Sequence, residues 1–165
     1  MMALLEFRKR GCQYVVLECG IGGKLDATNI IEKPICSAIT TIGLDHMEVI
    51  GNSVEEISAE KSGVIKNGIP CVIGPTCAQM KPIHERAQSM NSNLIQIEDH
   101  ETYDEVNNSM VAEIMQVVCK NERVAFDWDT MVSLARSVSQ PCRFEKIIGT
   151  KFNIIMDVCH NLQGV

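Results

Sequence analysis

Two short apolar runs, Tyr14–Cys19 and Cys36–Ile42, most constrain what this 165-residue chain can fold into. Each run is rich in apolar and β-branched residues, and a glycine follows it directly. Such runs are typical of buried β-strands. Glu18 then lies at the carboxyl end of the first strand, while Asp45 and His46 follow the end of the second. Because parallel α/β sheets bind ligands at this edge, the side chains predict a site for a cation and a phosphate.

Helical and strand-like segments alternate along the rest of the chain, which predicts an α/β fold built on a parallel sheet. We expect helices up to Gly11 and over 53–66, 79–90 (with Pro82 in its first turn), 104–120 and 127–138. Further strands are expected at 69–74, 94–97 and 152–156. The composition changes around 139–143, so we expect one domain at 1–140 and the start of another at 141–165.

The net charge and the cysteines argue against some classes of binding partner and indicate where the protein is located. A net charge of −6 and a pI near 5.2 argue against binding to nucleic acid or to an anionic membrane surface. The eight cysteines form no CxxC pair, and Cys19, Cys36 and Cys71 lie inside apolar runs. We therefore expect reduced thiols and a cytoplasmic protein without a signal peptide or membrane span.

The expected helix over 53–66 carries a lysine, Lys61, on its apolar face. Ser53 and Glu56 have the spacing of a capping box, which marks the start of the helix. Lys61 is four residues after Ile57 and three before Val64, so it shares their apolar stripe. A lysine in a dry environment has a lowered pKa, and a neutral amine can add carbon dioxide to become an anionic carbamate. The alternative is a snorkelling lysine paired with Glu56 or Glu60, which periodicity alone favours.

Other polar features have simpler explanations. The glycines at 20–23 precede Lys24 but lack the spacing of a phosphate-binding P-loop, and a tight turn explains them equally well. His84 and His100 stand alone in polar surroundings and are expected at the surface. Asp127–Asp129 is expected to be a helix N-terminus, where the helix dipole favours acidic side chains.

Two long motifs identify a family. LECGIGGKLDATN and TTIGLDHMEVIGNSVEEISAEKSGVIK closely resemble the folylpolyglutamate synthase and dihydrofolate synthase family, within the Mur ligase superfamily. Weaker likenesses follow in the family's order: Asn108, Pro141–Glu145 and Asp157–Asn161. The resemblance implies part of a Mur-ligase-type central ATPase domain, followed by the first strand of a Rossmann-like C-terminal domain.

Residue roles follow from this resemblance by matched position. It implies that Glu18 and His46 are magnesium ligands and that Lys61 is carbamylated beside the metal. It also implies nucleotide contacts for Asn108, Arg143 and Asp157 (the last to the ribose), and contact with the incoming glutamate or phosphate for His160. Asp26 and Asn29 would lie near the folate; their alternative role is that of turn residues with local hydrogen bonds.

The implied reaction is ATP-dependent ligation of L-glutamate to dihydropteroate or a folate through an acyl phosphate, by a monomer with Mg²⁺ as cofactor. The family's P-loop would precede residue 1 and most of its C-terminal domain would follow Val165, so we expect a fragment that is inactive alone. Motif departures, Asp104–Glu105 and Cys142 among them, leave open a degenerate, non-catalytic paralogue that serves as a binding or structural module. A ligase with a different acceptor, such as a peptidoglycan precursor, is a third possibility.

Overall fold

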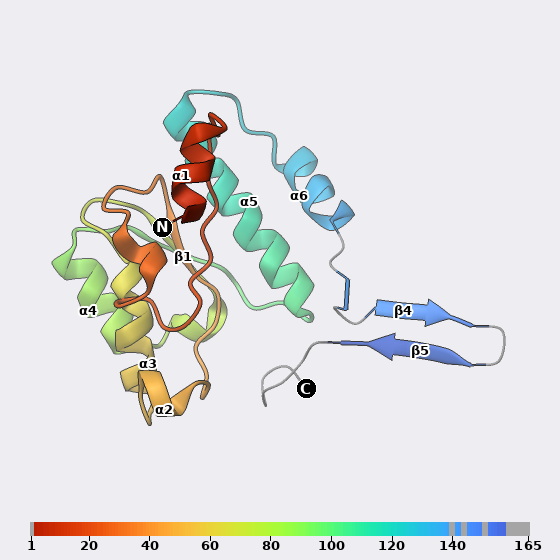
Figure 1. The fold of residues 1–165 in the computed structure, drawn as a ribbon, viewed down its shortest axis with the longest axis horizontal. Helices are drawn as coiled ribbons and strands as arrows, with labels where there is room; N and C mark the ends of the chain where they lie inside the picture. The colour runs from red at the N-terminus through yellow and green to blue at the C-terminus, as the bar shows by residue number, and fades with distance from the viewer. Residues whose placement is uncertain (1, 139–140, 143–144, 150–151, 158–165) are drawn as a thin grey trace. The chain divides into compact units, whose positions relative to one another are not determined.

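The computed structural model describes residues 2–138, 141–142, 145–149 and 152–157. They form two compact units that divide between Asp99 and His100. The first unit contains a three-stranded sheet, and the second a two-stranded one, which Figure 1 shows as two opposed blue arrows. The ligase-domain boundary expected near residue 140 stays a prediction. In the described part of the chain, no helix combines the length and the apolar character that a membrane crossing requires.

The sheet of the first unit is parallel throughout. Its strands are β1 (Ser37–Ile39), β2 (Cys71–Ile73) and β3 (Leu94–Gln96), in the order β1-β2-β3. Ser37 is in register with Cys71, and Cys71 with Leu94. Parallel strands need crossover connections, and the helical segments between these strands provide them. The predicted α/β fold with a parallel sheet is confirmed.

Short helices make up the rest of this unit. The α-helices are α1 (Met2–Lys9), α2 (Met47–Ile50), α3 (Val54–Lys61) and α4 (Lys81–Ser89). The 3₁₀ helices are η1 (Ala27–Ile30), η2 (Ser62–Val64) and η3 (Pro75–Cys77). Ser53 is the N-cap of α3, because its Oγ accepts a hydrogen bond of 3.1 Å from the Glu56 amide. Pro82 lies in the first turn of α4, as predicted.

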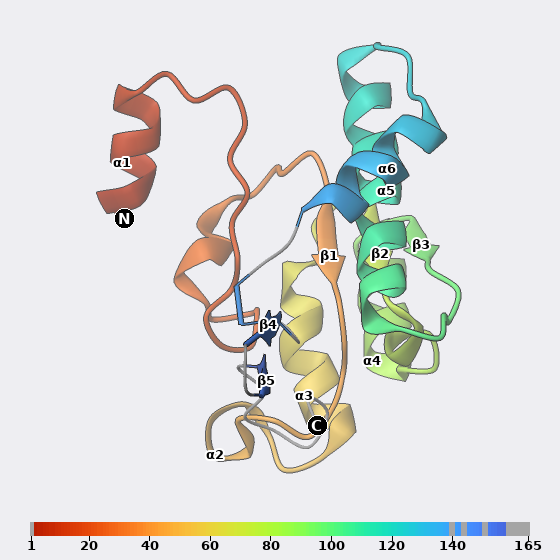
Figure 2. The same ribbon diagram turned by 90° about the vertical axis from the view of Figure 1, so that its right-hand side faces the viewer.

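The core of the first unit lies between the sheet and the α3, η2 and α4 segments. Ile65, Cys71, Ile73 and Ile83 are fully buried in one apolar cluster. Figure 2 shows α3 alongside β1. Removal of these side chains from water stabilises the arrangement of helices on the sheet. The cysteines of the described residues are free thiols, which agrees with the expectation of reduced cysteines.

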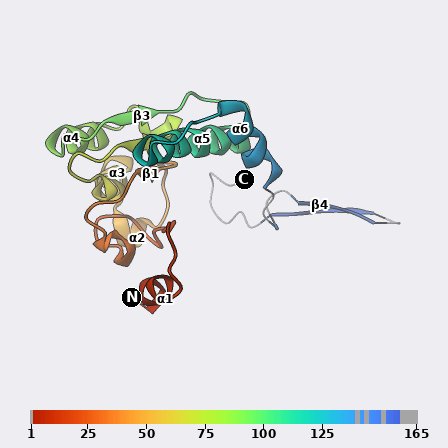
Figure 3. The same cartoon turned by 90° about the horizontal axis from the view of Figure 1, so that it is seen from above.

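The described residues of the second unit form two helices and one pair of antiparallel strands. Its elements are α5 (Tyr103–Glu122), α6 (Trp128–Ser137), β4 (Glu145–Ile148) and β5 (Asn153–Met156). A complete capping box between Thr102 and Glu105 starts α5. The two helices pack on each other (Figure 3), and β4 pairs antiparallel with β5. Asp127 is the N-cap residue of α6, so the predicted helix N-terminus is confirmed.

Several predicted boundaries were wrong. Residues 14–19 form no strand, and the Val16 side chain is 97% exposed. A strand needs a hydrogen-bonded neighbour strand. Within the described residues β1 pairs with β2 and not with residues 14–19, so this run joins no sheet. The helix expected over 53–66 ends at Lys61 and continues as η2, and α2, for which no helix was expected, precedes it. The strand expected over 36–42 is limited to β1.

Candidate active site

Lys61 ends helix α3 and points to the segment that follows β1. Its Nζ donates a hydrogen bond of 3.1 Å to the backbone carbonyl oxygen of Thr41. The two glutamates considered as its partners bind elsewhere: Glu56 accepts from the Asn52 amide at 2.7 Å, and Glu60 from the Leu25 amide at 3.2 Å. Lys61 is therefore half-buried and held by a backbone oxygen near the carboxyl end of a sheet strand.

His46 has an unusual backbone conformation. It precedes α2 with φ +48° and ψ +36°, the left-handed region, which non-glycine residues rarely adopt. Its amide donates to Asp45 Oδ1 at 2.9 Å, and its Nε2 lies 3.8 Å from Asp45 Oδ2. The imidazole is 43% exposed and remains accessible to a ligand. Strained residues of this kind cluster at functional sites.

Glu18 is exposed and precedes the glycine loop, which we define as residues 20–25. This loop reaches α2, which follows His46, and α3, which ends at Lys61. A Cβ atom added to Gly22 would lie 3.1 Å from Ile50 Cγ2 in α2 and 3.0 Å from Glu60 Cγ in α3. The structure thus brings the loop after Glu18 together with the helix after His46 and with the turn that carries Lys61.

Asp26 organises the residues around the glycine loop. Its Oδ1 accepts from the Thr28 amide at 2.8 Å and from the Thr28 hydroxyl at 2.6 Å. Its Oδ2 accepts from the Gly20 amide at 2.8 Å and from the Ile21 amide at 3.3 Å. The hydrogen bonds from Thr28 and then from these amides lower the pKa of Asp26 to about 2, because they favour the charged carboxylate.

Asn29 joins the end of this segment to the residues after α3. Its Nδ2 donates to the carbonyl oxygens of Lys24 at 3.2 Å and Gly63 at 3.1 Å. The Lys66 Nζ donates to the Asn29 carbonyl oxygen at 3.0 Å. These contacts agree with a structural role for Asn29.

Asp26 and Asn29 also line one pocket of about 480 Å³, together with Leu4, Lys24, Leu25, Ala27 and Ile30. The volume lies in the range of small-molecule sites. The structure therefore brings the two predicted substrate residues to one pocket wall, and their contact with substrate stays a prediction.

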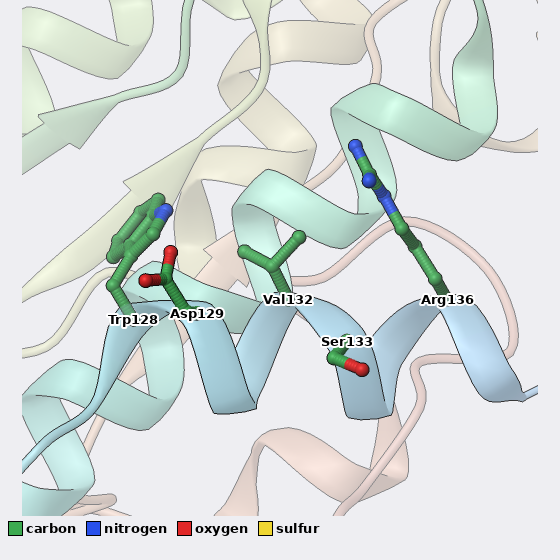
Figure 4. A pocket seen from close by; sticks show the side chains of 5 residues that line it. All are labelled: Trp128, Asp129, Val132, Ser133 and Arg136. Atoms are coloured by element: carbon green, nitrogen blue, oxygen red, sulfur yellow. The ribbon is translucent and has the colours of Figure 1, made fainter.

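The predicted nucleotide residues lie in the second unit. Asn108 is half-buried on α5, and Asp157 is exposed directly after β5. Arg143 and His160 lie outside the described residues. A pocket of about 290 Å³ on α6 is lined by Trp128, Asp129, Val132, Ser133 and Arg136 (Figure 4). All five come from one helix, and none was predicted as a site residue.

Sequence reasoning missed the roles of two residues that hold this region together, Glu60 and Lys66. Both bind backbone groups of the segment that follows Glu18, more than thirty positions away in the sequence. Local periodicity places Glu60 beside the apolar stripe, where a solvent-exposed carboxylate is the ordinary expectation. The tertiary contact is therefore not visible in the sequence pattern.

Comparisons with known proteins agree with the motifs. No protein-family model matches the chain. The dihydrofolate synthase/folylpolyglutamate synthase of Bacillus subtilis (strain 168) is 49% identical over 71 residues, which are 43% of this chain and 16% of that protein. The folylpolyglutamate synthase of Saccharomyces cerevisiae (strain FostersO) is 31% identical over 121 residues, 70% of this chain and 22% of that protein. The chain belongs to this synthase family.

Solved structures of the same family share its fold. A structure described as a folylpolyglutamate synthase–AMPPCP–folate complex has a TM-score of 0.87 and 25% identity, over 99% of this chain and 47% of that one. The apo form of the Lactobacillus casei (L. casei) synthase has a TM-score of 0.82 and 25% identity, over 96% and 46%. The chain thus spans less than half the length of each of these four relatives.

Proposed function

We propose that this chain forms part of an ATP-dependent ligase that joins L-glutamate to dihydropteroate or a folate. The names of its relatives support this reaction class. The observation that carries the proposal is the packing of the loop after Glu18 on α2, which follows His46, and on the turn of α3 that carries Lys61. This packing gathers elements that bear a carboxylate, an imidazole and an amine.

Glu18 and His46 are residue types that could hold Mg²⁺ together with the phosphates of a nucleotide. Mg²⁺ keeps several waters and is held by few protein ligands together with phosphate oxygens, so it needs no closed cage. Within the described residues, no group of three His, Cys, Asp or Glu side chains could hold a metal ion. The metal site that we propose therefore has few protein ligands and remains open to water and phosphate. Glu18 and His46 would hold the ion, and it would neutralise charge on the transferred phosphoryl group.

Lys61 would complete this site as a carbamate. Its neutral amine would add carbon dioxide, forming one N–C bond and releasing one proton, and the product carries a negative charge. The observed hydrogen bond to Thr41 fixes the position of Nζ before this addition. The carbamate would then orient the metal site from the end of α3.

The reaction would proceed in two displacements. A carboxylate oxygen of the acceptor attacks the γ-phosphorus of ATP and ADP leaves. The glutamate nitrogen then attacks the acyl carbon, phosphate leaves, and the nitrogen loses a proton. Asn108, Arg143 and Asp157 would position the nucleotide, and His160 would hold the glutamate or the phosphate. Positioning of this kind supplies much of the catalysis in phosphoryl transfer.

Metal binding by the purified chain tests the proposal directly. We expect the wild-type chain to bind Mn²⁺, used as a paramagnetic probe for Mg²⁺, and Glu18→Gln with His46→Ala to remove that binding. Glu55→Ala, an exposed carboxylate at the start of α3, is the control. A folded wild-type chain that binds no Mn²⁺ would contradict the proposal.

Glutamate-dependent ADP release, measured with dihydropteroate and a reduced folate in parallel, tests the reaction. Since the chain spans less than half of each relative, we expect no release from the isolated chain. Release would show that the chain forms its own phosphate site, and the preferred acceptor would identify the activity.

A second candidate function is that of a non-catalytic binding module. The departures from the family motifs at Asp104–Glu105 and Cys142 favour it. Absence of both Mn²⁺ binding and ADP release in a folded chain would support this candidate instead.

A further inference from the structure

We propose that Glu60 is a positioning residue of the metal site: it holds the glycine loop against the turn of α3 that presents Lys61. This inference rests on the proposed function, because it concerns the site of Glu18, His46 and Lys61. Glu60 itself is half-buried and is not among the residues assigned to metal or substrate.

Glu60 binds two consecutive amides of the glycine loop. Its backbone carbonyl oxygen accepts from the Lys24 amide at 3.0 Å, and its Oε1 accepts from the Leu25 amide at 3.2 Å. One residue thus fixes both the position and the direction of the chain at Lys24.

The glycine loop lies directly on the backbone beside Lys61. A Cβ atom on Gly23 would come within 2.8 Å of the Lys61 carbonyl oxygen, and one on Gly63 within 2.3 Å of the Lys24 Cα. Only residues without a side chain permit this approach. Movement of the loop would therefore change its distance from the residue that carries the proposed carbamate.

The segment that carries Glu18 is attached to η1 and to the residues after α3. Residues 14–16 are exposed and lie in no strand, and the Cys19 thiol lies 3.4 Å from the Thr28 hydroxyl in η1. At the other end, Asn29 and Lys66 attach the segment to the residues after α3. Nearer to Glu18, the Gly20 and Ile21 amides donate to Asp26. Glu60 therefore holds the Lys24–Leu25 end of the loop against α3, and loss of its side chain is expected to shift the loop that follows Glu18 relative to Lys61.

Chemistry distinguishes the role of Glu60 from that of a metal ligand. The contact to Leu25 needs an acceptor oxygen at this distance along the side chain and does not need a negative charge. Gln keeps that oxygen, whereas Ala removes it. A positioning residue should therefore be rescued by Glu60→Gln, and a metal-binding carboxylate should not.

Hydrogen–deuterium exchange of the purified chain tests the attachment without any metal. We expect slow exchange at the Leu25 amide in the wild type, fast exchange in Glu60→Ala, and slow exchange in Glu60→Gln, whereas the Lys24 amide keeps its backbone acceptor in all three. Glu55→Ala, on the same helix, is the control and should leave the exchange rates unchanged. Protection of the Leu25 amide in Glu60→Ala would overturn the proposal.

Mn²⁺ titration of the same variants tests the consequence for the site. Outer partners of metal ligands typically contribute about 10- to 100-fold to affinity, so we expect binding to Glu60→Ala to weaken by about tenfold. Glu60→Gln and Glu55→Ala should bind as the wild type does. Equal affinity of Glu60→Ala and wild type would overturn the positioning role. If the wild type bound no Mn²⁺, the proposed metal site itself would fail, and the exchange data would show separately whether Glu60 holds the loop.

Discussion

The Lys61 Nζ donates a hydrogen bond of 3.1 Å to the Thr41 carbonyl oxygen, which ties the last residue of α3 to the chain just beyond β1. This contact places a side chain from a helix at the carboxyl end of a parallel strand. Ligand sites in open α/β sheets form at this edge. His46 follows five residues after Thr41, so both predicted residues belong to one edge of the sheet.

Lys61→Ala should separate folding from catalysis. It removes one solvent-exposed hydrogen bond, so we expect a stability loss of at most about 1 kcal/mol in urea unfolding. In the intact ligase it should lower glutamate-dependent ADP release by at least about 100-fold, because a preorganised charge would be lost from the site.

His46→Ala is expected to have the same effect on ADP release, and it also removes the side chain of a strained left-handed residue. Activity within about twofold of the wild type in either variant would remove that residue from the metal site. Glu55→Ala serves again as the matched exposed control.

The segment around Asp26 should loosen in acid. The native pKa of Asp26 is about 2, below its ordinary value of 3.8, so the folded state favours the carboxylate. The stabilisation is therefore fully present above pH 3.8 and is lost as the pH falls towards 2. The amide chemical shift of Thr28, followed by NMR, should titrate with a midpoint near 2.

Asp26→Asn should abolish that titration, since an amide has no proton to gain in this range. A Thr28 midpoint at or above the ordinary value of 3.8 would show that the hydrogen bonds to Asp26 do not favour its charged form.

Local signals in the sequence were sufficient to predict many of the helix starts and strands of the first unit. The N-cap at Ser53 and the proline in the first turn of α4 both depend on backbone groups within one helical turn. β1, β2 and β3 were predicted because buried parallel strands are short apolar runs.

Features that depend on distant partners could not be predicted. The run at 14–19 has strand composition but forms no strand, because composition does not supply a hydrogen-bonded neighbour. Helix α3 ends at Lys61, where the glycine loop approaches Gly63. The left-handed conformation of His46 and the contact of Glu60 with Leu25 likewise depend on tertiary packing.

Buried cysteines should resist alkylation. Burial raises the pKa of Cys71 to about 12 and also raises that of Cys77 and Cys36, because an apolar environment disfavours the thiolate. Cys12 is exposed. With iodoacetamide at pH 8, mass spectrometry should show rapid labelling of Cys12, and of Cys71 and Cys77 only after urea is added. Labelling of Cys71 as fast as Cys12 in the native protein would contradict its burial.

Gly63→Ala should destabilise the first unit by steric overlap alone. The added Cβ would lie 2.3 Å from the Lys24 Cα and 2.7 Å from the Lys24 nitrogen, and backbone atoms cannot rotate away. We expect a loss of about 1–3 kcal/mol in urea unfolding, typical of overpacking. Gly20→Ala is the control, because its Cβ would meet only Asp26 Oδ2, at an ordinary 3.6 Å. Equal urea midpoints for the two variants would show that the glycine loop does not lie against Gly63 in solution.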